Sequence, residues 1–452
     1  MIDARVDELL APLGIDVDAS IDVQLHGTDP VLPTPYPIGA ASGAARAAVA
    51  TVAAQVWHDA TGVGQDVAVD VARAAESLVS FLLQRIGGPP LGRFGGFLET
   101  TRLYEAKGGR WIHLHGGFSH LAAGTLAVLD CEMDVAAIAA SVAARDAFEL
   151  EEALAAAGMC GAVARTREEW LVHAQHDALA PLGRVVVRKI ADGDPIRATD
   201  GERPFGAVKA LDLTRLLAGP TCGRTLAEHG ADVLLVNAPK LENIDMFVID
   251  TSHGKRSAVL DLDDPAGADR MRTLVREADV FVQGYRGRSM ERRGYGAEQL
   301  ADDHRGLIHV SVNCYGPIGP WKDRPGWEQL AQSVTGMVLG HSGTGRPEIV
   351  PGAVCDYTTG YLAALGAAVA LRRRAIEGGS YAVEASLCQT AEWVGGMPPV
   401  DPANAGLPGT ELMEVASEWA TVRHLPPVPQ LTVTPGRWAR PPSRIGSHPA
   451  SF

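Results

Sequence analysis

The 452-residue sequence lacks the features that mark several large classes of protein. It has only 6 cysteines, they stand far apart and no CxxC pair is present, which argues against a disulfide framework and against a zinc site. The 14 histidines show no HExxH or comparable ligand spacing, so we expect no bound metal. No apolar run approaches 18 residues, and the first residues are acidic and amphipathic, so we expect a cytoplasmic protein.

The sequence also has no lysine-rich or arginine-rich block. Lys and Arg total 40 against 54 Asp and Glu, a formal charge of −14, which argues against a nucleic-acid or anionic-membrane binder. Hydrophobic residues make up 46% and charged residues 21%, so the chain is too apolar to be mainly disordered. The expected partner is a small molecule.

One order of elements occurs twice in the chain. Residues 43–71 form an alanine-rich helix, a glycine turn and an alternating strand, and residues 360–387 repeat that order. The alternative is that two alanine-rich helices look alike by composition alone. We interpret the pattern as one supersecondary unit present in two copies.

The fold class that we predict is α/β. Alternating short strands and helices from residue 208 onward indicate a doubly wound, Rossmann-like parallel sheet; its helices include one opened by Asp264 and Pro265 and one near 297–303. A hairpin that turns at residues 107–109, followed by helices, indicates a smaller α+β domain. The predicted divisions are a first helix copy at 1–90, the small domain and a linker at 91–206, the Rossmann-like domain at 207–392, and a Pro- and Gly-rich extended arm at 393–452.

The first strand of this domain is followed by a turn, residues 214–220, that enters a helix. Unpaired amides at a helix start favour an anion, although Gly219 and Pro220 also suit a plain tight turn. The GxGxxG fingerprint is absent, and Asn237 stands where a ribose-binding acid is expected. A dinucleotide cofactor is therefore disfavoured.

Two basic groups follow later elements of the same predicted sheet. The first is residues 253–257, HGKRS, for which a solvated basic turn is the alternative. The second consists of Arg286, Arg288, Arg292 and Arg293. Two such groups suit a ligand with separated phosphates.

Asp356 immediately precedes the second alanine-rich helix. An N-cap is the ordinary role of an Asp at such a place. The functional interpretation is a nucleophilic carboxylate held at a helix N-terminus. In the first copy Gly39 or Ala40 falls opposite Asp356, so that copy lacks the carboxylate.

The segment from 208 to 392 resembles the class III CoA-transferase (CaiB/BaiF) family, which includes formyl-CoA transferases and 2-methylacyl-CoA racemases. The matching stretches are LDLTRLLAGP, LAEHGADVLLV, GKRSAVLDLDDPAG, ADVFVQGYRGRSMERRGYG, CYGPIGPWKDRPGWEQLAQSVTG and VCDYTTGYLAALGAAVALRRRAIEGGSYAVEASL. Usual members start with the Rossmann-like half. Here a helix copy and a small domain come first, as though two units had been fused and trimmed.

The resemblance implies transfer of CoA between an acyl-CoA and a free carboxylic acid, without a metal. Asp356 matches the family carboxylate that forms an acyl anhydride and then an aspartyl-CoA thioester. The family's CoA contacts match Arg215, Ala218, Lys255, Arg256 and Arg292. The resemblance also implies a homodimer.

Two positions depart from relatives within the family. Leu217 stands where some formyl-type members carry Gln, which disfavours a small oxalate-like substrate. Trp327 stands where racemases carry His, and an indole supplies no acid or base. Two rivals to CoA transfer stay open, namely a racemase that uses Asp356 with another base such as Glu328, and a CoA-binding protein without turnover. The acyl pocket is predicted to use loops at 87–90 and 93–96.

Overall fold

The protein is described from a computed structural model that covers residues 1–87, 97–286 and 289–452. Its centre is a seven-stranded sheet in the order β10-β9-β8-β11-β12-β13-β7. The strands are β7 (Val186–Ala191), β8 (Lys209–Leu213), β9 (Asp232–Asn237), β10 (Lys255–Val259), β11 (Val280–Gln283), β12 (Ile308–Asn313) and β13 (Ser380–Ser386). All neighbours pair in parallel except β7, which runs antiparallel to β13. From β8 to β13 the order is the 3-2-1-4-5-6 of a Rossmann fold, so the predicted α/β class is confirmed.

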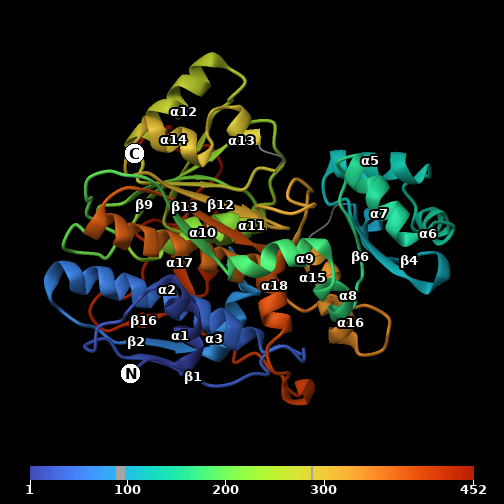
Figure 1. Cartoon of the computed structure of the whole chain (residues 1–452), viewed down its shortest axis with the longest axis horizontal. Coiled ribbons are helices and arrows are strands. Elements are labelled where there is room, and N and C mark those ends of the chain that lie inside the picture. The colour runs from blue at the N-terminus through green and yellow to red at the C-terminus, as the bar shows by residue number, and fades with distance from the viewer. Residues whose placement is uncertain (88–96, 287–288) are drawn as a thin grey trace.

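Both faces of the sheet are covered, because successive residues of each strand point to opposite sides. Val280 and Val282 belong to one hydrophobic cluster and Phe281 between them belongs to another. The helices on the Phe281 side are α12 (Pro265–Glu277), α13 (Ser289–Arg292) and α14 (Ala297–Asp303). The other side is covered by α10 (Ala218–Glu228) and α17 (Val354–Glu377), as Figure 1 shows.

The N-terminal region forms a second layered unit beneath α17. It contains α1 (Ala4–Leu10), β1 (Val23–His26), α2 (Ile38–Thr61), β2 (Val67–Asp70) and α3 (Val71–Ser77). Strands β1 and β2 pair in parallel, and α2 packs on them with one side and on α17 with the other (Figure 1). The two alanine-rich helices therefore lie back to back between two sheets.

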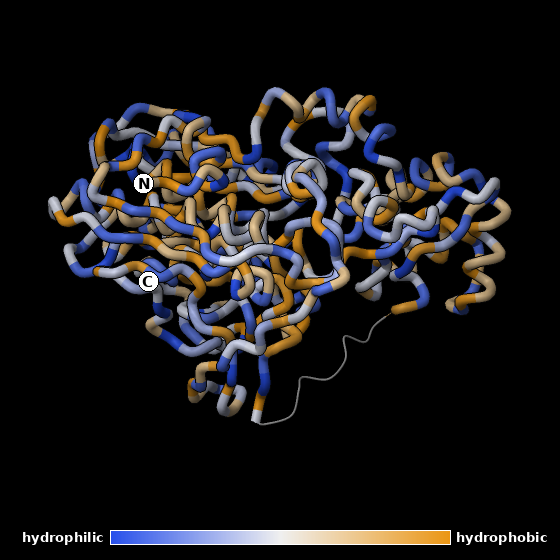
Figure 2. The backbone as a smooth tube through the Cα atoms, turned by 90° about the horizontal axis from the view of Figure 1, so that it is seen from below, coloured by the Kyte–Doolittle hydropathy of each residue, from blue (hydrophilic) through white to orange (hydrophobic). Residues whose placement is uncertain are grey.

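The small domain projects from one side of this body. Its sheet has the antiparallel order β4 (Thr101–Glu105), β5 (Trp111–His115), β6 (Gly161–Val163), covered by α5 (Ser119–Leu129), α6 (Val135–Ala143) and α7 (Ala147–Ala156). It has its own hydrophobic cluster, and both chain termini lie at the far end of the molecule from it (Figures 1 and 2). The hairpin turn at Lys107–Gly109 matches the predicted position.

The structure differs from two of the predicted divisions. Strand β7 was placed in the small domain by the 91–206 boundary, yet it is the edge strand of the large sheet. The segment 393–452 is more than an extended arm, because β14 (Met413–Ser417) and β15 (Ala420–His424) form a sheet with β3 (Arg85–Ile86), and β16 (Gln430–Leu431) pairs with β2. Both errors concern strands whose partners are distant in sequence.

The remaining helices are short connections around these units. They are α4 (Ser80–Leu83), α8 (Arg167–Leu171), α9 (Ala174–Leu179), α11 (Asp245–Thr251), α15 (Glu328–Val334), α16 (Met337–Ser342) and α18 (Leu387–Gly395). Helix α15 matters most for the site, because it packs against α17 and against β5 and β6 of the small domain.

Helix α17 is the one helix of the described residues that is long and apolar enough to cross a membrane, and 94% of its most apolar window is buried inside the protein. Small residues let it approach its neighbours closely. A Cβ added to Gly360 would lie 2.4 Å from the carbonyl oxygen of Ala218 on α10. A side chain at this position would push α10 away from the first turns of α17.

Candidate active site

Asp356 lies in the first turn of α17, but it is not the cap of that helix. The cap is the carboxylate of Glu328 at the start of α15. Its two oxygens accept the backbone N–H groups of Cys355, at 3.0 Å, and of Asp356, at 2.5 Å. The Gln332 side chain also donates to it, at 2.7 Å. The Asp356 carboxylate itself accepts no hydrogen bond from any described residue, which leaves it available to react.

Burial and the neighbouring Glu328 charge raise the pKa of Asp356 well above its ordinary value. Burial also raises the pKa of Glu328, although the N–H groups that it accepts oppose that shift. Two carboxylates at one helix start therefore resist being ionised together. Such a perturbed pair is typical of functional sites.

Aromatic side chains from both domains wall this region. The rings of Trp327 and His115 stack with centroids 4.9 Å apart, and Phe118 lies 5.7 Å from Trp327. The Trp327 indole donates to the sulfur of Cys160 at 3.2 Å. Burial lowers the pKa of His115 to about 4, so its imidazole is uncharged at neutral pH. The wall is apolar and lies next to Glu328.

Strands β8 and β11 are adjacent at the point where the strand order reverses, which is where Rossmann folds bind ligands. The turn after β8 holds Leu216 with φ 69°, a strained left-handed conformation for a branched side chain. Beside it the Arg215 guanidinium lies 5.5 Å from the Phe118 ring and donates to the carbonyl of Glu242. No carboxylate among the described residues forms an ion pair with Arg215, so its charge is free for an anion.

The basic segment at 253–257 is mostly interior, unlike the predicted phosphate-facing or solvated turn. The Lys255 ammonium is fully buried and donates to Asp212 at 2.8 Å and to the carbonyl of Pro220 at 2.6 Å. His253 packs against His424, with ring centroids 4.1 Å apart. A phosphate contact at Lys255 would require its buried ion pair to open.

The other predicted CoA contacts do not all lie at one edge of the sheet. Ala218 begins α10 directly after the strained turn, so it lies with Arg215 at the carboxyl edge. Arg256 is the second residue of β10, near the start of that strand, where it is half-buried and pairs with Asp232 at 2.5 Å. Arg292 ends α13, after β11, with its side chain exposed. These contacts remain predictions.

Some predicted positions lie outside the described residues. They are Arg288 of the second basic group and most of the loops proposed for the acyl pocket, at 88–90 and 93–96. Of the remaining arginines, Arg286 donates to the carbonyl of Gly158 in the small domain at 3.1 Å, and Arg293 pairs with Asp263 at 2.6 Å.

The first helix copy repeats the cap without the nucleophile. The carboxylate of Asp29 accepts the N–H groups of Gly39, at 3.1 Å, and of Ala40, at 2.7 Å. These are the second and third residues of α2, as Cys355 and Asp356 are of α17. The structure therefore identifies Ala40 as the counterpart of Asp356.

Comparisons with known proteins support the resemblance of the central segment. Residues 207–414 match the profile of CoA-transferase family III. The chain is 33% identical over 317 residues to an acyl-CoA transferase of Gibberella moniliformis, covering 64% of this chain and 55% of that protein. It is 31% identical over 202 residues to the succinyl-CoA–L-malate CoA-transferase beta subunit of Chloroflexus aurantiacus, covering 41% and 50%.

A crystal structure of Rv3272 from Mycobacterium tuberculosis is also similar, with 27% identity, a TM-score of 0.40 and coverage of 42% of this chain and 57% of that one. The chain spans about half the length of the curated relatives that it matches.

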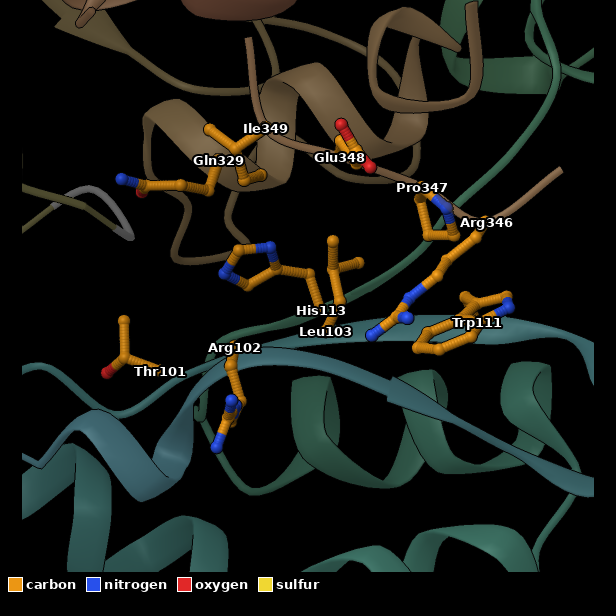
Figure 3. Close-up of a pocket in the computed structure, with 10 residues that line it drawn as sticks. All are labelled: Thr101, Arg102, Leu103, Trp111, His113, Gln329, Arg346, Pro347, Glu348 and Ile349. Atoms are coloured by element: carbon orange, nitrogen blue, oxygen red, sulfur yellow. The ribbon is translucent and has the colours of Figure 1, made fainter. Parts of the chain in front are cut away.

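The segment that matches the family III profile meets the small domain at a cavity that the sequence did not reveal. It lies between the β4–β5 hairpin, the start of α15 and the loop at 346–349 (Figure 3). No motif marks these residues, because the hairpin and the loop come together only in the folded chain.

The described residues contain no group of three or more His, Cys, Asp or Glu side chains placed to hold a metal ion.

Proposed function

We propose that the protein transfers CoA between an acyl-CoA thioester and a free carboxylic acid, with Asp356 as the nucleophile. The observation that carries the proposal is the free carboxylate of Asp356 on the first turn of α17, beside a capping Glu328 that already holds the backbone amides. The family III match of the surrounding segment supports the reaction class.

The proposed reaction begins with attack of an Asp356 carboxylate oxygen on the thioester carbonyl. The carbon–sulfur bond breaks, CoA leaves as a thiolate, and a mixed anhydride remains on the side chain. The thiolate then attacks the aspartyl carbonyl, so the first acid leaves as its carboxylate and an aspartyl-CoA thioester forms. The second acid attacks the carbonyl of this thioester, which releases the CoA thiolate and gives a new mixed anhydride. The thiolate finally attacks the acyl carbonyl of that anhydride, which forms the new acyl-CoA and restores the Asp356 carboxylate.

The surroundings fit these needs. The intermediates are destroyed by water, and the apolar wall of Trp327, His115 and Phe118 limits its access. Arg215 offers an unpaired charge at the sheet edge for a CoA phosphate. The Asp356 carboxylate must be ionised to attack, so its raised pKa predicts that the transfer rate increases with pH through that pKa.

Glu328 is a poor second base for the rival racemase. Its oxygens are occupied by two backbone amides and by Gln332, and it is 4% exposed. The homodimer implied by the family resemblance is also proposed here, and light scattering on the purified chain tests it.

The test is a screen of acyl-CoA donors against carboxylate acceptors with wild type, Asp356→Asn, Asp356→Ala and the control Asp302→Asn, which alters an exposed acid on α14. We expect both Asp356 variants to lose about 10³-fold or more of the transfer rate, as when a nucleophile is removed, and the control to keep it. Hydroxylamine should trap an adduct on Asp356 in wild type during turnover.

Three outcomes would contradict the proposal. Full activity in both Asp356 variants would rule out Asp356 as the nucleophile. Exchange of the α-hydrogen with deuterated water in the absence of an acceptor acid would indicate a racemase. Tight CoA binding with neither adduct nor exchange would indicate a binding protein.

A further inference from the structure

The cavity between the two domains measures about 620 Å³, which is in the usual range for a small-molecule site. Its lining residues are Thr101, Arg102, Leu103, Trp111, His113, Gln329, Arg346, Pro347, Glu348 and Ile349. The hairpin of the small domain contributes one wall, and α15 with the loop before α17 contributes the other (Figure 3).

The hairpin wall carries polar groups that have no partner. In the antiparallel register Leu103 is opposite His113 and Thr101 is opposite His115, so these side chains share one face. His113 is 3% exposed, and neither of its ring nitrogens has a hydrogen-bond partner within the described part of the chain. The hydroxyl of Thr101 is also buried without a partner there. Buried polar groups left unpaired are costly, so they point to a ligand.

His113 is an uncharged member of this wall. Burial lowers its pKa to about 3, so the imidazole offers one N–H donor and one acceptor at neutral pH. In Figure 3 its ring rises from β5 toward Gln329 on α15. It therefore lies between the two walls and faces the cavity.

One arginine supplies positive charge to the cavity. Figure 3 shows the Arg346 side chain reaching down toward the hairpin, and its guanidinium lies 5.6 Å from the Trp111 ring. No carboxylate of the described residues forms an ion pair with it. Arg102 instead points to the opposite face of the hairpin, where it lies 6.0 Å from the Tyr104 ring. Among the described residues, Glu348 is the one acid that lines the cavity.

The cavity is linked to Asp356 by adjacent residues. The rings of His113 and His115 lie 6.4 Å apart, and His115 stacks on Trp327. Gln329 follows Glu328, which binds the backbone of Asp356. A molecule in the cavity therefore contacts α15 one residue after the carboxylate that accepts the backbone N–H of Asp356.

We propose that this cavity binds the acceptor of the transfer, a small dicarboxylic acid, by the carboxylate that does not react. Arg346 binds the carboxylate, His113 and Thr101 donate hydrogen bonds, and Leu103, Ile349 and Pro347 contact the carbon chain. This assignment rests on the proposed function for its role, although not for the binding itself.

The test is isothermal titration of the Asp356→Asn protein with succinate, n-butyrate, methylsuccinate and inorganic phosphate. Because this variant lacks the proposed nucleophile, binding is measured without turnover. We expect Arg346→Gln to weaken carboxylate binding by about tenfold or more, since a charged hydrogen bond is lost. Arg276→Gln removes the same charge from an exposed position on α12, away from the cavity lining, and should leave binding unchanged. Glu348→Gln removes the opposing acid and should strengthen binding.

In an active background, Arg346→Gln should raise KM for the acceptor acid while CoA affinity and the hydroxylamine adduct from the donor stay unchanged. The assignment is overturned if no carboxylate binds, if Arg346→Gln and Arg276→Gln act alike, or if phosphate binds as tightly as the acids through Arg346. Carboxylate binding without any CoA exchange in wild type would instead contradict the proposed function, while the assignment of the cavity as a carboxylate-binding site would still hold.

Discussion

Helices α2 and α17 are two copies of one scaffold with different chemistry. Each helix has 24 residues and connects two parallel strands. Each is capped by a carboxylate that accepts hydrogen bonds from the N–H groups of the second and third helical residues. The third residue is Ala40 in one and Asp356 in the other. The comparison shows that the cap and the packing are structural requirements of the unit, whereas the reactive carboxylate is an addition that the fold does not need.

A buried ion pair joins the first copy to α10, and breaking it has the largest expected effect on stability. Arg46 of α2 lies 3.4 Å from Glu228 of α10 and 4.5 Å from the Tyr361 ring of α17. Arg46→Ala leaves Glu228 buried and unpaired, which should lower the free energy of unfolding by about 3–5 kcal/mol in urea titrations.

The matched double variant Arg46→Leu with Glu228→Leu removes both charges and should lose much less, because no charge is then left unpaired. Equal losses in the single and double variants would show that the two units are held together by packing alone.

Removing each cap in turn distinguishes its effect on stability from its effect on the transfer reaction. Asp29→Ala and Glu328→Ala should each lower the free energy of unfolding by about 1–2 kcal/mol, the usual cost of a lost cap. Only Glu328→Ala should alter transfer. It removes the negative charge beside Asp356, so the pH profile of the rate should move to lower pH. A similar change of profile in Asp29→Ala would mean that α2 takes part in the reaction.

The smallest effect is a gain in stability from Asp356→Asn. The pKa of Asp356 is raised in the folded protein, so the folded state binds a proton more tightly than the unfolded chain. As pH rises from about 4 through the folded pKa, the wild type therefore loses stability. At neutral pH the Asn variant should be more stable by about 0.5–2 kcal/mol, with the difference vanishing in acid.

Urea titrations at acidic and neutral pH measure this difference. Ala40→Asp is the reciprocal change, because it places a second acid beside Asp29 in the first copy. It should destabilise the protein increasingly as pH rises, and a pH-independent effect would contradict the electrostatic explanation.

Much of the local structure was predictable from sequence patterns. Asp264 and Pro265 begin α12, α14 spans the expected residues 297–303, and the hairpin turns at the predicted glycines. These signals are local, since capping and turn formation depend on neighbours a few residues away. Strand β7 was missed because its partner β13 lies far along the chain.

Site prediction followed the same division. The sequence places Asp356 at the start of a helix, although as the residue before that helix rather than its third residue. Its freedom from capping depends on Glu328, which the sequence suggested only as a base. Lys255 belongs to a basic motif, yet its partner Asp212 comes from another strand. His113 and Arg346 carry no motif, and only the docking of the small domain places them at one cavity.

The sequence alone determines the alternation of strands and helices from residue 208 to 392, the two alanine-rich helices and the acidic residue at the start of one of them. These features follow from periodicity and helix-end chemistry, which are short-range. The tertiary structure decided which charges are buried in pairs, which carboxylate caps and which is left to react, and where the cavity opens. Those properties depend on contacts between residues far apart in the chain, since burial and partner together determine whether an ionisable group is structural or reactive.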